Sequence, residues 1–151
     1  MISETINKQI AEAMKSKDEV RLSTLRMLSS ELHNAKIDKR AAGPEGDLNK
    51  DDEIKVVRSE AKKRKDAIEA YKKAGAKNRA EKEEKELEIL KEFLPKEMSD
   101  EELEKIVTTT IAENGVKDTK EMGRVIGAVM KKAGGKAEGG RVAEIVKTKL
   151  T

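Results

Sequence analysis

The sequence predicts an all-α protein, and three observations lead to that fold class. Charged residues make up 42% of the 151 residues, whereas aromatic residues make up only 1%. β-Sheets depend on aromatic and β-branched cross-strand pairs, so this composition disfavours a sandwich or barrel. Apolar residues also recur every three or four positions along most of the chain. We therefore expect an N-terminal antiparallel bundle or set of helical hairpins, followed by a small three-helix domain.

The first two helices are predicted from apolar residues at helical spacing. In the first helix such residues recur every four positions, at Ile2, Ile6, Ile10 and Met14. We expect Ser3 to be its N-cap, because a side-chain oxygen can accept a hydrogen bond from a free backbone amide. Residues 15–18 break the pattern, and Asp18 can cap the second helix. The second helix keeps the spacing at Leu25, Leu28, Leu32 and Ala35.

A loop and a long third helix follow. Residues 42–47 contain two glycines and one of the two prolines, which predicts an exposed loop. The third helix should begin at Asp51 or Asp52 and end at Gly75. Its expected buried face consists of Ile54, Val57, Ala61, Ile68 and Tyr71. The four consecutive cations at 62–65 point in all directions around a helix, so we expect their charges to stay in water.

The fourth helix is predicted over residues 79–93 and marks the end of the first domain. Its apolar residues share one face, at Leu87, Leu90 and Leu94. Pro95 cannot continue the helix, so we place a domain boundary there. The predicted domains are therefore residues 1–95, with about four helices, and residues 96–151, with three.

Capping signals divide the second domain into three helices. Ser99 and Glu102 form a capping-box pattern before an apolar stripe of Leu103, Ile106, Val107 and Ile111. Asn114 and Gly115 should end that helix, and Asp118 or Thr119 should cap the next. The next helix carries Met122, Val125, Ile126, Val129 and Met130, and it should end at Gly134 and Gly135. The last helix should follow residues 138–140 and carry Val142, Ile145, Val146 and Leu150.

The sequence lacks the residues that are characteristic of most enzyme classes. There is no Cys and only one His, which excludes thiol nucleophiles, thiolate metal sites and histidine relays. Residues 134–141 loosely resemble a phosphate-binding loop, but they lack a preceding strand and the Lys-Ser/Thr pair. The Glu-rich run at 81–92 is interleaved with lysines, which favours a solvated helix face over a metal site. We expect no catalytic residue, no metal and no cofactor.

No membrane partner is expected, because no apolar run approaches the roughly 20 residues of a spanning helix. The N-terminal residues also lack the apolar run of a signal peptide, so we expect a cytoplasmic protein.

The charge distribution yields the candidate binding residues. Residues 120–151 hold eight Lys and Arg against three acids, whereas residues 96–119 hold three against seven. Basic residues near a Gly-rich turn can approach a phosphate backbone, and the amides that begin the last helix add to the attraction. The alternative interpretation is a solubilising surface. The predicted nucleic-acid-binding residues are Arg124, Lys131, Lys132, Lys136, Gly139, Gly140 and Arg141.

Several motifs together resemble the GatB/YqeY family. They are residues 22–28 (LSTLRML), 64–71 (RKDAIEAY), 81–87, Leu94-Pro95, 103–115, 122–127 (MGRVIG) and 139–142. Each motif is weak alone, but their order and spacing along the whole chain are specific. The sequence is similar to stand-alone YqeY-like proteins.

The resemblance implies an all-helical fold and kinship with the tail domain of the B subunit of glutamine-dependent aminoacyl-tRNA amidotransferase. That enzyme converts misacylated Glu-tRNA or Asp-tRNA to the glutaminyl or asparaginyl form. Its tail domain helps to hold the tRNA. Its phosphorylating and glutaminase sites lie in other domains and subunits, and nothing in these 151 residues matches them. An assignment of carbon–nitrogen ligase activity with glutamine as amido-N-donor would therefore rest on kinship with that enzyme and not on residues of this chain.

Three functions remain open from the sequence. The first is a non-catalytic module that binds tRNA and is linked to tRNA-dependent amidation and translation. The second is a protein-interaction domain that binds amidotransferase subunits or an aminoacyl-tRNA synthetase through the N-terminal helices. The third is an amidotransferase-related protein that acts only with partner subunits.

Overall fold

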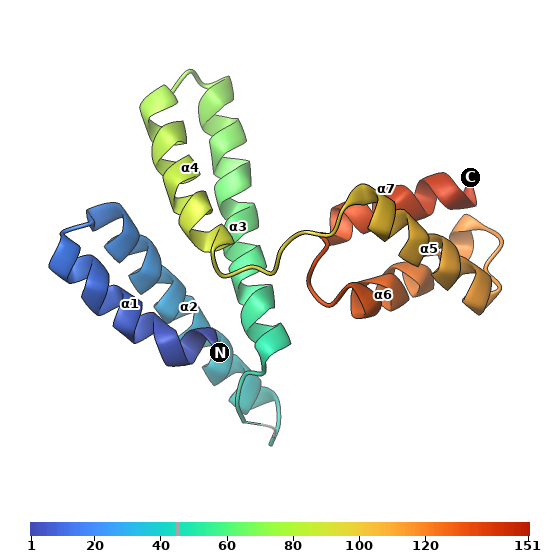
Figure 1. Ribbon diagram of the computed structural model, residues 1–151, viewed down its shortest axis with the longest axis horizontal. Helices are drawn as coiled ribbons and strands as arrows, with labels where there is room; N and C mark the ends of the chain where they lie inside the picture. The colour runs from blue at the N-terminus through green and yellow to red at the C-terminus, as the bar shows by residue number, and fades with distance from the viewer. Residues whose placement is uncertain (45) are drawn as a thin grey trace. The chain divides into compact units, whose positions relative to one another are not determined.

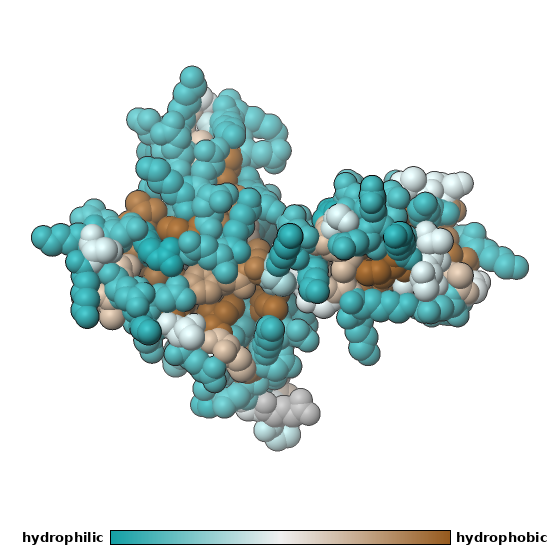
Figure 2. Space-filling view, viewed as in Figure 1, coloured by the Kyte–Doolittle hydropathy of each residue, from teal (hydrophilic) through white to brown (hydrophobic). Residues whose placement is uncertain are grey.

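The computed structural model describes residues 1–44 and 46–151, and these form two compact units, Met1–Leu94 and Pro95–Thr151. Within the described residues there are seven α-helices, one short 3-10 turn and no strand, which confirms the all-α prediction. Hydrophilic side chains cover most of the visible surface of each unit (Figure 2).

The first unit consists of two helical hairpins (Figure 1). The first pairs α1 (Ile2–Ser16) with α2 (Glu19–Ala42), and the second pairs α3 (Lys50–Lys73) with α4 (Lys77–Lys91). Their shared core contains Ile6, Ala13, Leu25, Leu28, Leu32, Val57 and Leu90. The hairpin arrangement follows from the short connections, because adjacent helices joined by few residues pack antiparallel.

The start of α1 differs from the prediction. The helix begins at Ile2, and Ser3 lies in its first turn rather than at the N-cap. The amide and hydroxyl of Ser3 instead donate to the carboxylate of Glu53, which comes from α3. At the other end, Met14 is 53% exposed, whereas its neighbour Ala13 is 2% exposed and belongs to the core.

The starts of α2 and α3 show how local side chains set helix ends. Asp18 caps α2 as predicted, accepting from the amide of Arg21 at 3.1 Å. The predicted start of α3 is late, because Asn49 is its N-cap and Asp52 completes the capping box. The amide of Asp52 lies 2.9 Å from Asn49 Oδ1, and the amide of Asn49 lies 3.0 Å from Asp52 Oδ2.

The loop between α2 and α3 begins one residue later than predicted. Ala42 belongs to α2, and the helix ends at Gly43. Of the other predicted loop residues, Glu45 lies outside the described residues.

The second hairpin extends beyond the shared core. Ile54, Val57 and Ala61 are buried as predicted, whereas Ile68 and Tyr71 are half-buried. In Figure 1 this end of α3 lies beside α4 and beyond the first hairpin, so one neighbouring helix covers its apolar face. The fourth helix, α4, begins two residues before the predicted position, at Lys77.

The second unit contains α5 (Asp100–Asn114), the 3-10 turn η1 (Thr119–Glu121), α6 (Met122–Ala133) and α7 (Gly139–Leu150). Its core consists of Leu103, Val107, Val116, Val125, Val129, Ala133, Ala137, Val142 and Val146. Ser99 and Glu102 form the predicted capping box. Gly115 and Gly134 end α5 and α6 in the left-handed region, at φ values of 62° and 56°, where a side chain would strain the backbone.

Two predicted boundaries in this unit are wrong by two or three residues. Asp118 caps η1 rather than α6, because the chain first makes a tight turn. The pair Gly139 and Gly140 does not precede α7 but forms its first turn, after Glu138. Among the described residues, no helix is both long enough and apolar enough to cross a lipid bilayer.

Candidate nucleic-acid interface

The seven predicted binding residues all lie on α6, on the turn after it, or in the first turn of α7. Arg124, Lys131 and Lys132 belong to α6, and Lys136 belongs to the turn. Gly139, Gly140 and Arg141 are the first three residues of α7. The end of α6 and the start of α7 are close in sequence, so residues 131–141 form one continuous segment of the second unit.

Arg141 has a structural role within this segment. Its Nε donates to Asp100 Oδ1 at 2.9 Å, and its Nη2 donates to the carbonyl oxygen of Met98 at 2.9 Å. The amide of Met98 in turn donates to the carbonyl oxygen of Lys136 at 2.7 Å. These bonds hold the segment before α5 against the turn before α7. The guanidinium charge of Arg141 is therefore already balanced by an acid.

Lys132 and Arg124 also have intramolecular partners. Lys132 Nζ lies 2.5 Å from Glu113 Oε2 and 3.2 Å from Thr110 Oγ1, so it ties α6 to α5. Arg124 donates to the carbonyl oxygen of Asn114 at 2.8 Å, at the last residue of α5. Carbonyl groups at a helix C-terminus are unpaired and carry a partial negative charge, which a cation stabilises.

Lys131 and Lys136 remain exposed to solvent. Within residues 1–44 and 46–151, neither of their side chains has a hydrogen bond or an ion pair. Gly139 and Gly140 are exposed as well, and a Cβ atom built on either would meet no atom within 4 Å. The side chain of Glu138 makes no cap hydrogen bond to the first turn of α7. Two lysines and an open helix start thus form the accessible part of the predicted site.

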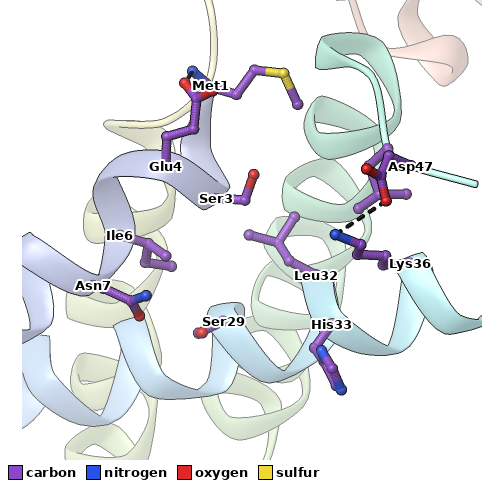
Figure 3. Close-up of a pocket in the computed structure, with 11 residues that line it drawn as sticks. Met1, Ser3, Glu4, Ile6, Asn7, Ser29, Leu32, His33, Lys36 and Asp47 are labelled. Carbon is purple, nitrogen blue, oxygen red and sulfur yellow. Dashed lines mark hydrogen bonds and ion pairs between the residues drawn. The ribbon is translucent and has the colours of Figure 1, made fainter.

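The first unit contains a separate hollow of about 490 Å³ beside α1 and α2 (Figure 3). Its charged groups already have partners, because the N-terminal amine lies 2.7 Å from Glu4 Oε2 and Lys36 Nζ lies 3.1 Å from Asp47 Oδ1. His33 is exposed, and Figure 3 shows its ring directed away from Ser3 and Glu4. His33 therefore does not contact the Ser3 hydroxyl, which donates to Glu53 instead.

Sequence reasoning missed two buried charge clusters in the first unit. Glu53 is fully buried and accepts from the amides of Ile2 and Ser3, at 2.7 and 3.1 Å. In the sequence, the one indication that Glu53 is buried is its position next to the apolar stripe of α3.

The second missed cluster surrounds Arg64, which was expected to stay solvated. Its guanidinium lies 2.9 Å from Glu86, 3.3 Å from Glu60 and 3.5 Å from Glu83. Burial, together with the neighbouring Glu86 carboxylate, raises the pKa of Glu83 above its ordinary value. In the described part of the chain, no group of three or more His, Asp or Glu residues is arranged to hold a metal ion.

Comparisons with known proteins agree with these observations. A family model described as Yqey-like protein matches residues 3–150. An uncharacterized protein of Schizosaccharomyces pombe is 35% identical over 94 residues, which cover 62% of this chain and 72% of that protein. The family match spans both helical units and every motif on which the resemblance was based, so the chain belongs to the YqeY-like family.

Proposed function

We propose that this chain is a non-catalytic accessory module that binds tRNA through its second unit and serves tRNA-dependent amidation. The observation that carries the proposal is the pair of unpartnered lysines, Lys131 and Lys136, beside the open start of α7. The relation of the YqeY family to the amidotransferase B-subunit tail domain supports tRNA as the ligand.

The recognition would rest on phosphates and shape rather than on bases. The sequence holds one Tyr, one Phe and no Trp, so aromatic stacking on unpaired bases has few candidates. Folded RNA is read mainly through its backbone and its overall geometry. Lysine side chains and helix-start amides are suited to phosphate oxygens, because both donate hydrogen bonds to anions.

Because Lys132 and Arg141 have structural partners, the binding site is better tested by variants of other residues. Reversing Lys132 or Arg141 would break bonds that hold the second unit together, so a loss of binding could reflect unfolding. Lys131→Glu with Lys136→Glu removes the two accessible charges instead. We expect this double variant to weaken tRNA binding and its salt dependence, measured by gel shift at several salt concentrations.

A matched control exists on the same unit. Lys147→Glu with Lys149→Glu changes the net charge equally, and both lysines are exposed at the far end of α7. Unchanged binding in the control and weakened binding in the site variant support the proposal. Equal binding by the site variant and the parent would refute it.

The proposal assigns no chemistry to the chain alone. We expect no glutamine-dependent amidation of misacylated tRNA by the isolated protein, assayed by release of the amidated amino acid. Turnover by the isolated protein would favour the amidotransferase interpretation.

A protein-binding role for the first unit is the second candidate. It is favoured by an open groove of about 560 Å³ between the start of α2 and α4, where Val20 and Ile89 are flanked by acids. Pull-down of amidotransferase subunits or a synthetase, with Ile89→Asp as the disrupting variant, tests this role.

A further inference from the structure

The third helix carries a high density of positive charge, which the proposed function does not use. Residues 55–79 hold ten Lys and Arg against three acids. Some of these cations have acidic partners. Lys63 lies 2.7 Å from Glu60, and Lys72 lies 2.9 Å from Glu84. Arg64 contacts three carboxylates, as described above.

Four other cations of α3 share a different face of the helix. Lys55, Arg58, Lys62 and Lys65 follow one another at spacings of three, four and three residues, which places them along one side. This α3 basic stripe spans eleven residues, or about 15 Å of helix. Lys55 and Lys62 are exposed, and Arg58 and Lys65 are half-buried.

Three of the four stripe residues lack the ion pairs found on the rest of the helix. Among the residues that the structure describes, Lys55, Arg58 and Lys62 have no ion-pair partner. The Nε atom of Arg58 is buried and has no hydrogen-bond acceptor. Acids lie beyond both ends of this run, at Asp51, Asp66 and Glu69, so the cations without an ion pair lie within residues 55–62.

We propose that the α3 basic stripe binds the phosphate backbone of structured RNA. This surface shares its ligand class with the proposed function but lies in the first unit and uses none of the same residues. A row of cations on a straight helix presents its charges at fixed intervals. Each phosphate that such a cation neutralises releases condensed counterions, which is the main source of sequence-independent affinity.

The composition of the stripe favours RNA over a protein or a membrane. Ser59 lies between its cations on the same face, and Asp66 follows Lys65, so neither position adds an apolar side chain. Protein interfaces need a buried apolar or aromatic centre, and membrane-bound helices need an apolar face. With no aromatic residue on the stripe to stack on bases, binding depends on backbone phosphates and is independent of base sequence.

The partial burial of Arg58 contributes to this binding. A half-buried stem restricts the rotamers of the side chain before any ligand arrives, so less conformational entropy is lost on binding. The planar guanidinium also matches two phosphate oxygens at once. Arg58→Lys should therefore weaken binding even though the charge is kept.

The test uses the full chain and two fluorescent RNA probes, a tRNA transcript and a 20-base-pair duplex of unrelated sequence. The stripe variant is Lys55→Glu with Lys62→Glu. The matched control is Lys8→Glu with Lys15→Glu, which changes the charge equally at two exposed lysines of α1. Circular dichroism and thermal melting establish that every variant is folded, and Lys55→Gln with Lys62→Gln repeats the test without added negative charge.

We expect the stripe variant to lose roughly tenfold or more in affinity for both probes at about 0.1 M salt. The slope of log affinity against log salt should fall by about one for each phosphate contact removed. The control should stay within a few-fold of the parent. Equal losses in the stripe and control variants would reduce the effect to net charge and overturn the proposal, as would unchanged binding by the stripe variant.

The same assay separates this inference from the proposed function. Loss of binding in Lys131→Glu with Lys136→Glu, but not in the stripe variant, would support the second-unit site and overturn the stripe. The reverse pattern would support the stripe and overturn the second-unit site. Absence of RNA binding by the parent protein would overturn both.

Discussion

A single buried carboxylate joins α3 to the start of α1 in the first unit. Glu53 is fully buried on α3 and accepts hydrogen bonds from the first-turn amides and a hydroxyl of α1. The free amides at a helix start carry a partial positive charge, which an anion stabilises. The carboxylate thus replaces the local side-chain cap that α1 lacks.

Glu53→Gln should destabilise the protein because the neutral amide keeps the volume but loses the charge. Hydrogen bonds to charged groups contribute about 1.5–3 kcal/mol, so the free energy of unfolding should fall by about 2 kcal/mol in urea titration. Glu12→Gln, at an exposed position of α1, serves as the control. Equal stability of the two variants would contradict the capping role.

Neighbouring lysines of the 62–65 run should respond differently to charge reversal. Lys62→Glu should change the free energy of unfolding by less than about 0.5 kcal/mol, because it is exposed and unpaired in the described part of the chain. Lys63→Glu should lower Tm clearly, because it places a second negative charge beside the buried Glu60 carboxylate. Thermal melts of the two variants check this, and similar Tm values would contradict it.

At the scale of elements, the start of α3 is anchored to α2 by an ion pair. Lys39 Nζ lies 2.6 Å from Asp52 Oδ2, which also accepts from the amide of Asn49. The Lys39 ammonium and then the Asn49 amide hold the pKa of Asp52 below its ordinary value. The carboxylate therefore both caps α3 and ties it to the neighbouring hairpin.

This lowered pKa predicts a specific loss of stability in acid. A group whose pKa is lower in the folded state contributes stability above its unfolded pKa, near pH 4, and the contribution disappears as pH falls through the folded pKa. Asp52→Asn should therefore lower stability at pH 7 and reduce the loss of stability below pH 4. Urea titrations from pH 2 to 7 measure this.

Asp51→Asn is the control for the acid experiment, since Asp51 is an exposed neighbour without an ion pair among the described residues. It should leave the acid dependence of the parent intact. An acid dependence in Asp52→Asn as steep as that of the parent would show that the ion pair has no role in stability.

At the scale of the whole molecule, the division at residues 94 and 95 predicts that the second unit folds alone. A fragment of residues 96–151 should be soluble and helical by circular dichroism, because its valine-rich core is complete within the unit. Its stability should be modest, since domains of about 60 residues bury only some 60% of their chain surface.

The control for the fragment is Val129→Asp, which places a charge in that core. The parent fragment should melt cooperatively and the control should not. A random-coil spectrum of the parent fragment would contradict an independent second unit.

The sequence by itself determined the helices, some of their ends and the family. Helix ends such as those at Asp18, Ser99 and Gly115 depend on side chains and backbone angles within four residues, and local sequence contains that information. Boundaries were missed where two local signals competed. Asn49, for instance, lies just before two acids that can also act as caps.

The tertiary structure decided which charges are available for binding. Glu53 meets α1 across 50 residues, Arg64 meets Glu86 across 22, and Arg141 meets Asp100 across 41. Helical periodicity assigns a residue to a face of its own helix but does not identify the side chain that faces it from another. Cations that looked equivalent in sequence therefore differ, because Arg64, Lys132 and Arg141 have partners from distant segments, whereas Lys131 and Lys136 point into solvent.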